Sequence, residues 1–124
     1  MAYVAAVSKP LHTVVETPDY LADAKRAGMN EADRRRAVDT YAELPGYGEE
    51  IQGSGGFRKG RIAGRGKGKS GGYRVVSIYL DEGTPVFLVA VLSKGDRENF
   101  SDVEVAEFKK IATAIKAAHR RRRS

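Results

Sequence analysis

The sequence predicts a single α+β domain, in which a small, mostly antiparallel sheet carries N-terminal helices and one C-terminal helix. A length of 124 residues allows one modest core. A hydrophobic content of 41% suits a folded chain. Short β-branched runs alternate with segments of helical periodicity, in the order β-α-α-β-β-β-α. We expect one domain over residues 1–124, with flexible ends at 1–10 and 119–124.

The first strand and the first helix follow from local signals. Residues 11–16 (LHTVVE) include β-branched side chains and predict a strand. Thr17 can cap a helix, because a proline follows it at the first helical position. That helix should run to about residue 27, where Gly28 stops it.

A second helix is predicted after Asn30, which can cap it, with Asp33 in the first turn favoured by the helix dipole. Pro45 should end it. The three arginines at 34–36 are expected to point largely to solvent. The apolar stripe of this helix is expected to be Val38, Tyr41 and Leu44.

Three further strands are predicted around a glycine-dense region that holds nine of the 14 glycines, between residues 53 and 72. The run VFLVAVL is apolar at every position, as in a central strand buried on both faces. A turn at 81–84 precedes it, in which Gly83 can take a positive φ. We expect the strands at residues 57–63, 73–80 and 86–92.

The last element is predicted to be an amphipathic helix. Ser101 begins a capping box that Glu104 completes three residues later. Apolar side chains then recur at helical spacing, at Val105, Phe108, Ile111 and Ile115. Four arginines at 120–123 follow as a basic tail.

The charge of the chain is concentrated in one segment. The net charge is +6, and residues 51–80 hold seven basic residues and no acid, while the rest is close to neutral. A clustered basic surplus predicts a polyanionic partner, with nucleic acid the first choice. These basic residues are Arg58, Lys59, Arg61, Arg65, Lys67, Lys69 and Arg74.

Other function classes are disfavoured by composition. The chain has no cysteine and only two histidines, His12 and His119, so we expect no disulfide, no metal site and no cofactor. No apolar run is long enough to cross a membrane, and the first residues lack the basic start of a secretory signal. We therefore expect a soluble, cytoplasmic protein.

Residues 63–70 (AGRGKGKS) fit a relaxed phosphate-loop pattern. A phosphate loop leads directly into a helix, whereas here two glycines and a β-branched run follow and predict a strand. A nucleotide-binding loop is therefore disfavoured. A solvated hairpin loop, charged only for solubility, is a plainer alternative to a binding site.

Hairpin geometry predicts that basic groups from three segments converge. If the turn at 81–84 joins two antiparallel strands, Arg74 lies close to Leu92. If the loop at 64–72 does the same, Arg61 lies opposite Arg74. Lys94 and Arg97 then emerge at the same end of the sheet, and Arg58 lies further from it. Such a cluster can cleave RNA, because the 2′-OH is the nucleophile and cations neutralise the phosphate oxygens.

The segment GSGGFRKGRIAGRGKGKSGGYRVVSIYLDEGTPVFLVAVLSKGDRENFS, residues 53–101, resembles the core of RelE-type toxins of bacterial toxin–antitoxin modules. Within them it looks most like the HigB-like branch. The shared pattern is a basic glycine–lysine loop, Gly-Gly-Tyr-Arg at a strand start, Leu-Asp-Glu at a turn, an apolar strand and a polar loop before the last helix.

The resemblance implies a fold related to microbial ribonucleases and a metal-independent, ribosome-dependent cleavage of mRNA. It also implies a cognate antitoxin, expected to be a helix-turn-helix protein, so that operator DNA is met only indirectly through that antitoxin. The implied catalytic residues are Arg74, Arg61, Lys94 and Arg97. The implied RNA- or ribosome-binding residues are Arg58, Lys59, Arg65, Lys67, Lys69 and Tyr73.

One departure from the family leaves the acid/base residue open. Some members place a tyrosine near the start of the last helix, where this chain has Phe100 and Ser101. A lysine or Asp96 is the alternative. Two further functions remain open: a non-catalytic RNA- or ribosome-binding module, and a gyrase-inhibiting toxin of the ParE-like branch.

Overall fold

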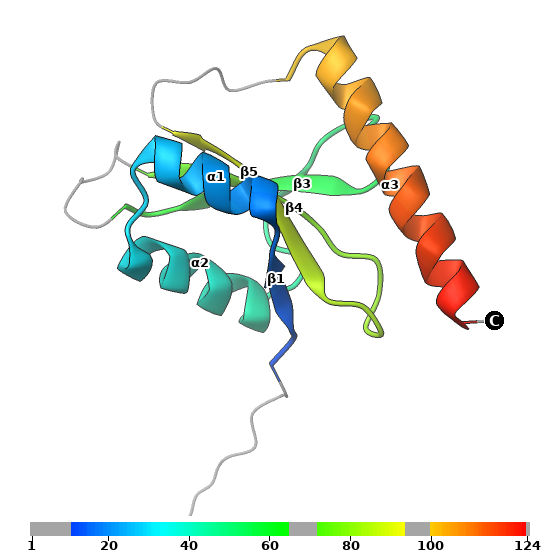
Figure 1. Cartoon of the computed structure of the whole chain (residues 1–124), viewed down its shortest axis with the longest axis horizontal. Helices are drawn as coiled ribbons and strands as arrows, with labels where there is room; N and C mark the ends of the chain where they lie inside the picture. Colours follow the sequence, from blue (N-terminus) through cyan, green and yellow to red (C-terminus); the bar gives the residue numbers. More distant parts are fainter. Residues whose placement is uncertain (1–10, 65–71, 94–99, 124) are drawn as a thin grey trace, which may run out of the picture.

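The computed structural model describes residues 11–64, 72–93 and 100–123 (Figure 1). Three helices and a five-stranded sheet form an α+β fold, which confirms the predicted class. The strands are ordered β1-β5-β4-β3-β2 across the sheet. Their bounds are Val14–Glu16 for β1, Glu49–Glu50 for β2, Phe57–Ile62 for β3, Tyr73–Ile78 for β4 and Val86–Ser93 for β5.

The sheet is antiparallel except at one edge, as predicted. Strand β1 runs parallel to β5, with Val14 opposite Val86. Strand β4 is the central strand and pairs antiparallel with β3 and β5. Strand β2 was not predicted: it has two residues, both exposed, and therefore no hydrophobic pattern. Strand β1 is shorter than expected, since only its last three residues pair.

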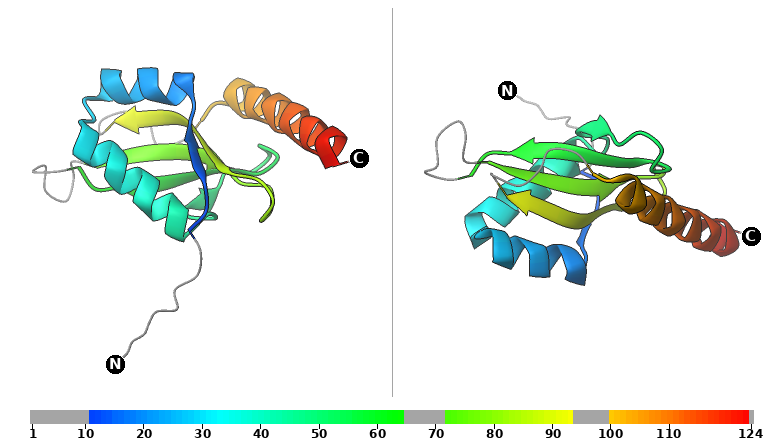
Figure 2. Two further views of the ribbon diagram at one scale, coloured as in Figure 1. Left: turned by 60° about the horizontal axis from the view of Figure 1, so that its bottom comes forward. Right: turned by 90° about the horizontal axis from the view of Figure 1, so that it is seen from above.

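Helices α1 (Pro18–Ala27) and α2 (Glu31–Glu43) lie on one face of the sheet (Figure 2). Their predicted caps are confirmed: the Thr17 hydroxyl accepts from the Tyr20 N–H, and Asn30 and Asp33 form a reciprocal capping box. Gly28 ends α1 in the left-handed conformation with φ 86°. This face buries a core of aromatic and aliphatic side chains that includes Tyr20, Tyr41, Val75 and Leu88.

Two details of α2 differ from the prediction. Leu44 is 56% exposed, and the buried stripe is instead formed by Ala37 and Tyr41. Two of the three arginines are also engaged: Arg34 binds the Glu16 carboxylate at 3.0 and 3.1 Å, and Arg36 binds Asp33. Packing against the sheet, rather than helical spacing alone, decides which side chains are buried.

Helix α3 (Asp102–Arg123) packs on the other face and projects beyond the strand ends (Figure 2). The Ser101–Glu104 capping box is confirmed by hydrogen bonds of 2.8 and 3.2 Å. The Phe108 ring packs 5.0 Å from that of Phe57. Ile111, predicted to face the core, is 46% exposed, and Ala112 is buried in its place.

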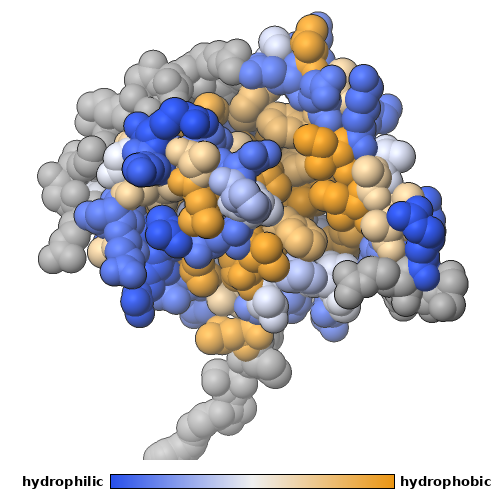
Figure 3. Space-filling model, in the orientation of Figure 1, coloured by the Kyte–Doolittle hydropathy of each residue, from blue (hydrophilic) through white to orange (hydrophobic). Residues whose placement is uncertain are grey.

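The C-terminal end of α3 is tied to the body of the protein. The His119 Nε2 lies 3.0 Å from an Asp81 carboxylate oxygen. Residues 119–123, expected to be flexible, continue the helix. Apolar side chains reach the surface between α1 and α3 (Figure 3). Phe87 and Val89 of β5 are partly buried and pack against the core cluster that includes Phe57 and Ala112.

Strand β5 carries an irregularity that the sequence did not predict. Val76 pairs with Ala90 but Ser77 pairs with Leu88, so Val89 is an extra residue on β5. Such a bulge lets the apolar side chains on either side keep to their own faces of the sheet. Beyond β1, the Val91 N–H donates to the Asp23 carboxylate of α1 at 3.1 Å.

The turn between β4 and β5 lies where it was expected. The Thr84 N–H donates to the Asp81 carbonyl, which closes the turn. Gly83 does not take the predicted positive φ; its N–H instead donates to the Asp81 side chain at 2.8 Å. A side-chain acceptor at Asp81 therefore stabilises this turn without left-handed backbone.

Candidate nucleic-acid interface

Two arginines lie directly opposite each other on the central strands. Arg61 of β3 pairs with Arg74 of β4, and Arg74 pairs in turn with Leu92 of β5, as the hairpin geometry predicted. Paired residues of an antiparallel sheet have Cβ atoms about 5 Å apart on the same face. Both guanidinium groups therefore leave the sheet side by side, and we name them the arginine pair.

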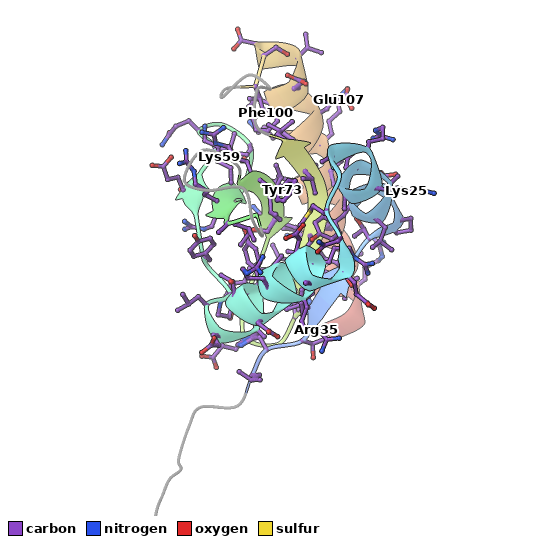
Figure 4. All side chains as sticks on the ribbon, turned by 90° about the vertical axis from the view of Figure 1, so that its left-hand side faces the viewer. Lys25, Arg35, Lys59, Tyr73, Phe100 and Glu107 are labelled. Carbon is purple, nitrogen blue, oxygen red and sulfur yellow. The ribbon has the colours of Figure 1, made fainter. Side chains whose placement is uncertain are left out.

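Lys59 extends the arginine pair along β3. It lies two residues before Arg61 and opposite Val76, so it shares the face that also carries α3. In Figure 4, Lys59 and Phe100 lie on this side of the sheet, whereas Arg35 belongs to α2 on the other side. Arg61 and Arg74 of the predicted cluster are thus brought together, and Lys59, an expected RNA-binding residue, lies on the same face.

The remaining predicted cations, apart from Arg58, belong to the two chain segments that follow β3 and β5 in the sequence. Strand β3 ends at Ile62, β4 begins at Tyr73, and Tyr73 pairs with Ser93 at the end of β5, so three strand ends meet beside the arginine pair. Arg65, Lys67, Lys69, Lys94 and Arg97, together with Asp96, lie outside the described residues. Their roles stay predictions.

Two predicted RNA contacts lie elsewhere. Arg58 alternates to the α2 side of β3, where its guanidinium donates to the Gly48 carbonyl at 2.9 Å. Tyr73 is 2% exposed, and its hydroxyl donates to the Gly28 carbonyl at 3.2 Å. Both side chains connect structural elements on the helix side of the sheet, so the geometry argues against either one contacting RNA beside the arginine pair.

Two tyrosines pack over Gly60 behind the arginine pair. A Cβ at Gly60 would lie 2.7 Å from the Tyr41 hydroxyl oxygen and from two carbons of the Tyr47 ring. Only glycine admits both rings here. The Tyr47 hydroxyl donates to the Arg61 carbonyl at 2.7 Å. Burial raises the pKa of Tyr41 to about 12, so this tyrosine stays neutral at physiological pH.

Arg36 of α2 reaches the end of β3. Its guanidinium donates to the Ala63 carbonyl at 2.9 Å and to the Asp33 carboxylate at 3.2 Å. Asp33 is 2% exposed, so Arg36 compensates a buried carboxylate. Sequence reasoning missed Arg36 and Tyr47. The available signal was Gly60, because an isolated glycine in a strand marks a close approach by another group.

The two histidines lie at the opposite end of the sheet. His12 lies 3.1 Å from the Tyr79 hydroxyl and, with it, lines an open pocket of about 920 Å³. His119 is engaged with Asp81. Among the described residues no His, Cys, Asp and Glu side chains gather in a group of three or more that could hold a metal ion.

The expectation that residues 63–70 do not lead into a helix, as a phosphate loop would, is confirmed. After Gly72 the chain enters strand β4 rather than a helix, so no helix N-terminus follows the loop to bind a phosphate.

In the described part of the chain, no helix has both the length and the apolar character needed to cross a membrane.

A comparison with protein families agrees with this arrangement. The family model described as the RelE toxin of the RelE / RelB toxin–antitoxin system matches residues 21–122. The match begins in α1 and ends in α3, so it includes every strand from β2 to β5 and the arginine pair. The chain belongs to the RelE toxin family of toxin–antitoxin systems.

Proposed function

We propose that this toxin is an endoribonuclease that cleaves mRNA on the ribosome and so inhibits translation. The observation that carries the proposal is the pairing of Arg61 with Arg74 on one face of the sheet. Two guanidinium groups at this spacing can hold the oxygens of one phosphate, and Arg stays protonated throughout. Lys59 adds a third positive charge on the same face.

The chemistry needs no bound metal. The 2′-OH of the RNA attacks the adjacent phosphorus, so that the 2′-O–P bond forms and the P–O5′ bond breaks. The 2′-OH loses its proton, the 5′-oxygen gains one, and the products are a 2′,3′-cyclic phosphate and a 5′-OH. Arg61 and Arg74 would neutralise the charge that grows on the non-bridging oxygens. The Lys59 ammonium is our candidate for protonating the 5′-oxygen.

A toxin of this family has an antitoxin as its partner. We further propose that this antitoxin is a helix-turn-helix protein, that the toxin belongs to the HigB-like branch, and that it acts in the cytoplasm. The toxin itself would bind ribosomes and mRNA and would meet operator DNA only through the antitoxin. The excess of positive charge between residues 51 and 80 supports a polyanionic target.

The test uses purified full-length protein, translating ribosomes and a defined mRNA. We expect new 5′ ends inside translated codons, with 5′-OH rather than 5′-phosphate termini. A 2′-deoxy nucleotide at the cleaved position should abolish the cut, because the nucleophile is missing. Cleavage of the 2′-deoxy substrate, or 5′-phosphate products, would show that another reaction takes place.

A non-catalytic RNA- or ribosome-binding toxin is the second candidate. The observation that favours it is the placement of both histidines at the far end of the sheet, away from the arginine pair. It predicts salt-sensitive ribosome binding with intact mRNA. A gyrase-inhibiting toxin would instead cause double-strand DNA breaks while mRNA stays whole.

A further inference from the structure

The outer edge of β3 is only partly paired with another strand. Strand β2 pairs with Arg58 and Lys59 and then ends. Further along this edge, the carbonyl of Arg61 accepts from the Tyr47 hydroxyl at 2.7 Å, and the carbonyl of Ala63 accepts from Arg36 at 2.9 Å. Side chains from α2 and the segment after it therefore take over where β2 stops.

We propose that Tyr47 and Arg36 are positioning residues that hold the end of β3 so that Arg61 stays opposite Arg74. This inference rests on the proposed ribonuclease function. Neither residue touches RNA in the proposal. Each one acts through the backbone of β3, and thus through the direction in which the Arg61 side chain leaves the sheet.

Tyr47 is itself fixed at three points. Its ring lies over Gly60 and meets the Tyr41 ring edge-on, with centroids 5.6 Å apart. Its N–H donates to the Leu44 carbonyl at 2.9 Å. Because packing holds the Tyr47 ring in one rotamer, its hydroxyl positions the Arg61 carbonyl more precisely than a hydroxyl on a mobile side chain would.

Arg36 is fixed by the capping box of α2. Asp33, which binds Arg36, also accepts from the Asn30 N–H at 3.0 Å, and its own N–H donates to the Asn30 side chain. The guanidinium thus connects a buried helix start to Ala63 at the exit of β3. A positive charge displaced by about 1 Å from its productive position beside the transition-state phosphate loses much of its effect.

Tyr47→Phe is the principal test, because it removes one hydroxyl and keeps the ring. In the ribosome assay we expect kcat to fall about fivefold, the value of one neutral hydrogen bond, with KM unchanged. The fall should vanish in an Arg61→Ala background, because Tyr47 acts through Arg61. Tyr79→Phe, which removes a hydroxyl at the opposite end of the sheet, should leave both constants unchanged.

Arg36→Ala tests the second residue against Arg35→Ala, its exposed neighbour on α2. A single guanidinium nitrogen of Arg36, Nη1, donates to both the Asp33 carboxylate and the Ala63 carbonyl, and alanine has no donor for either, so kcat should fall only in the Arg36 variant. A loss in Tyr47→Phe that persists in full without Arg61, or one confined to KM, would overturn the positioning role.

A spectroscopic measurement separates failure of this inference from failure of the proposed function. If the wild-type protein cuts no mRNA, the ribonuclease proposal is lost but the positioning can still be measured. The carbonyl ¹³C shift of Arg61 and the order parameter of its side-chain Nε should both change in Tyr47→Phe. Unchanged values would refute the inference on their own.

Discussion

Replacing Gly60 by alanine should destabilise the protein, although alanine is usually the better strand residue. The new Cβ would lie 2.7 Å from the Tyr41 hydroxyl and the Tyr47 ring, about 1 Å closer than carbon atoms normally approach. Overpacking of this kind costs about 1–3 kcal/mol. Lower backbone entropy in the unfolded chain returns about 0.5–1 kcal/mol. We expect a net loss of about 1–2 kcal/mol.

Urea unfolding followed by circular dichroism measures this loss, with Gly46→Ala as the matched control. A Cβ at Gly46 would meet no atom within 4 Å, and Gly46 is not among the glycines with positive φ. Gly46→Ala should therefore be neutral or slightly stabilising. In a Tyr47→Ala background, about half of the Gly60→Ala cost should disappear, because one of its two neighbours is gone.

Two results would contradict the close approach of the two tyrosines to β3. If Gly60→Ala raises the free energy of unfolding as much as Gly46→Ala does, the rings do not press on the strand. Equal costs of Gly60→Ala with and without Tyr47 would likewise show that the Tyr47 ring is not the obstacle.

Three further predictions follow from the same geometry. In a cleavage assay, Arg74→Ala should reduce the rate of mRNA cleavage by about 100-fold or more, because it removes a transition-state contact. Arg58→Ala should change that rate by less than about threefold. In ribosome-free binding to single-stranded RNA, Arg61→Ala should reduce the slope of log K against log salt by about 0.7, and Arg58→Ala should leave the slope unchanged. Because the pKa of Tyr41 is raised to about 12 in the folded state, stability should be full below pH 10 and fall between pH 10 and 12, by about 1.4 kcal/mol per pH unit for this group; alkaline unfolding of Tyr41→Phe should show a shallower decline.

Local chemistry was enough to predict where the helices begin. Thr17, Asn30 and Ser101 each cap the helix that the sequence assigned to them, because a capping side chain acts on backbone within three residues. Burial along the helices was harder to predict. Ile111 and Leu44 fit helical spacing, but both are exposed, whereas Ala112 and Tyr41 are buried. Which part of a helix meets the sheet is a tertiary property that periodicity does not contain.

The arginine pair was predictable because strand register follows from the position of the turns. The turn at 81–84 places Arg74 opposite Leu92, and the same reasoning places Arg61 opposite Arg74. The bulge at Val89 escaped this reasoning, because one inserted residue leaves no compositional mark. The roles of Tyr47 and Arg36 were not predicted, because both side chains bind backbone carbonyl groups. Every residue has such a group, so the sequence does not show which one is bound.

The Asp23 carboxylate determines what can be added to the sheet. It occupies the Val91 N–H on the side of β5 where β1 has ended, so a foreign peptide that sought to extend β1 would have to displace a negatively charged competitor. Inhibitors designed as extended strands should therefore fail at this position. Asp23→Ala would remove the acceptor of the Val91 N–H and leave that N–H available to a strand of another copy of the protein, which favours self-association.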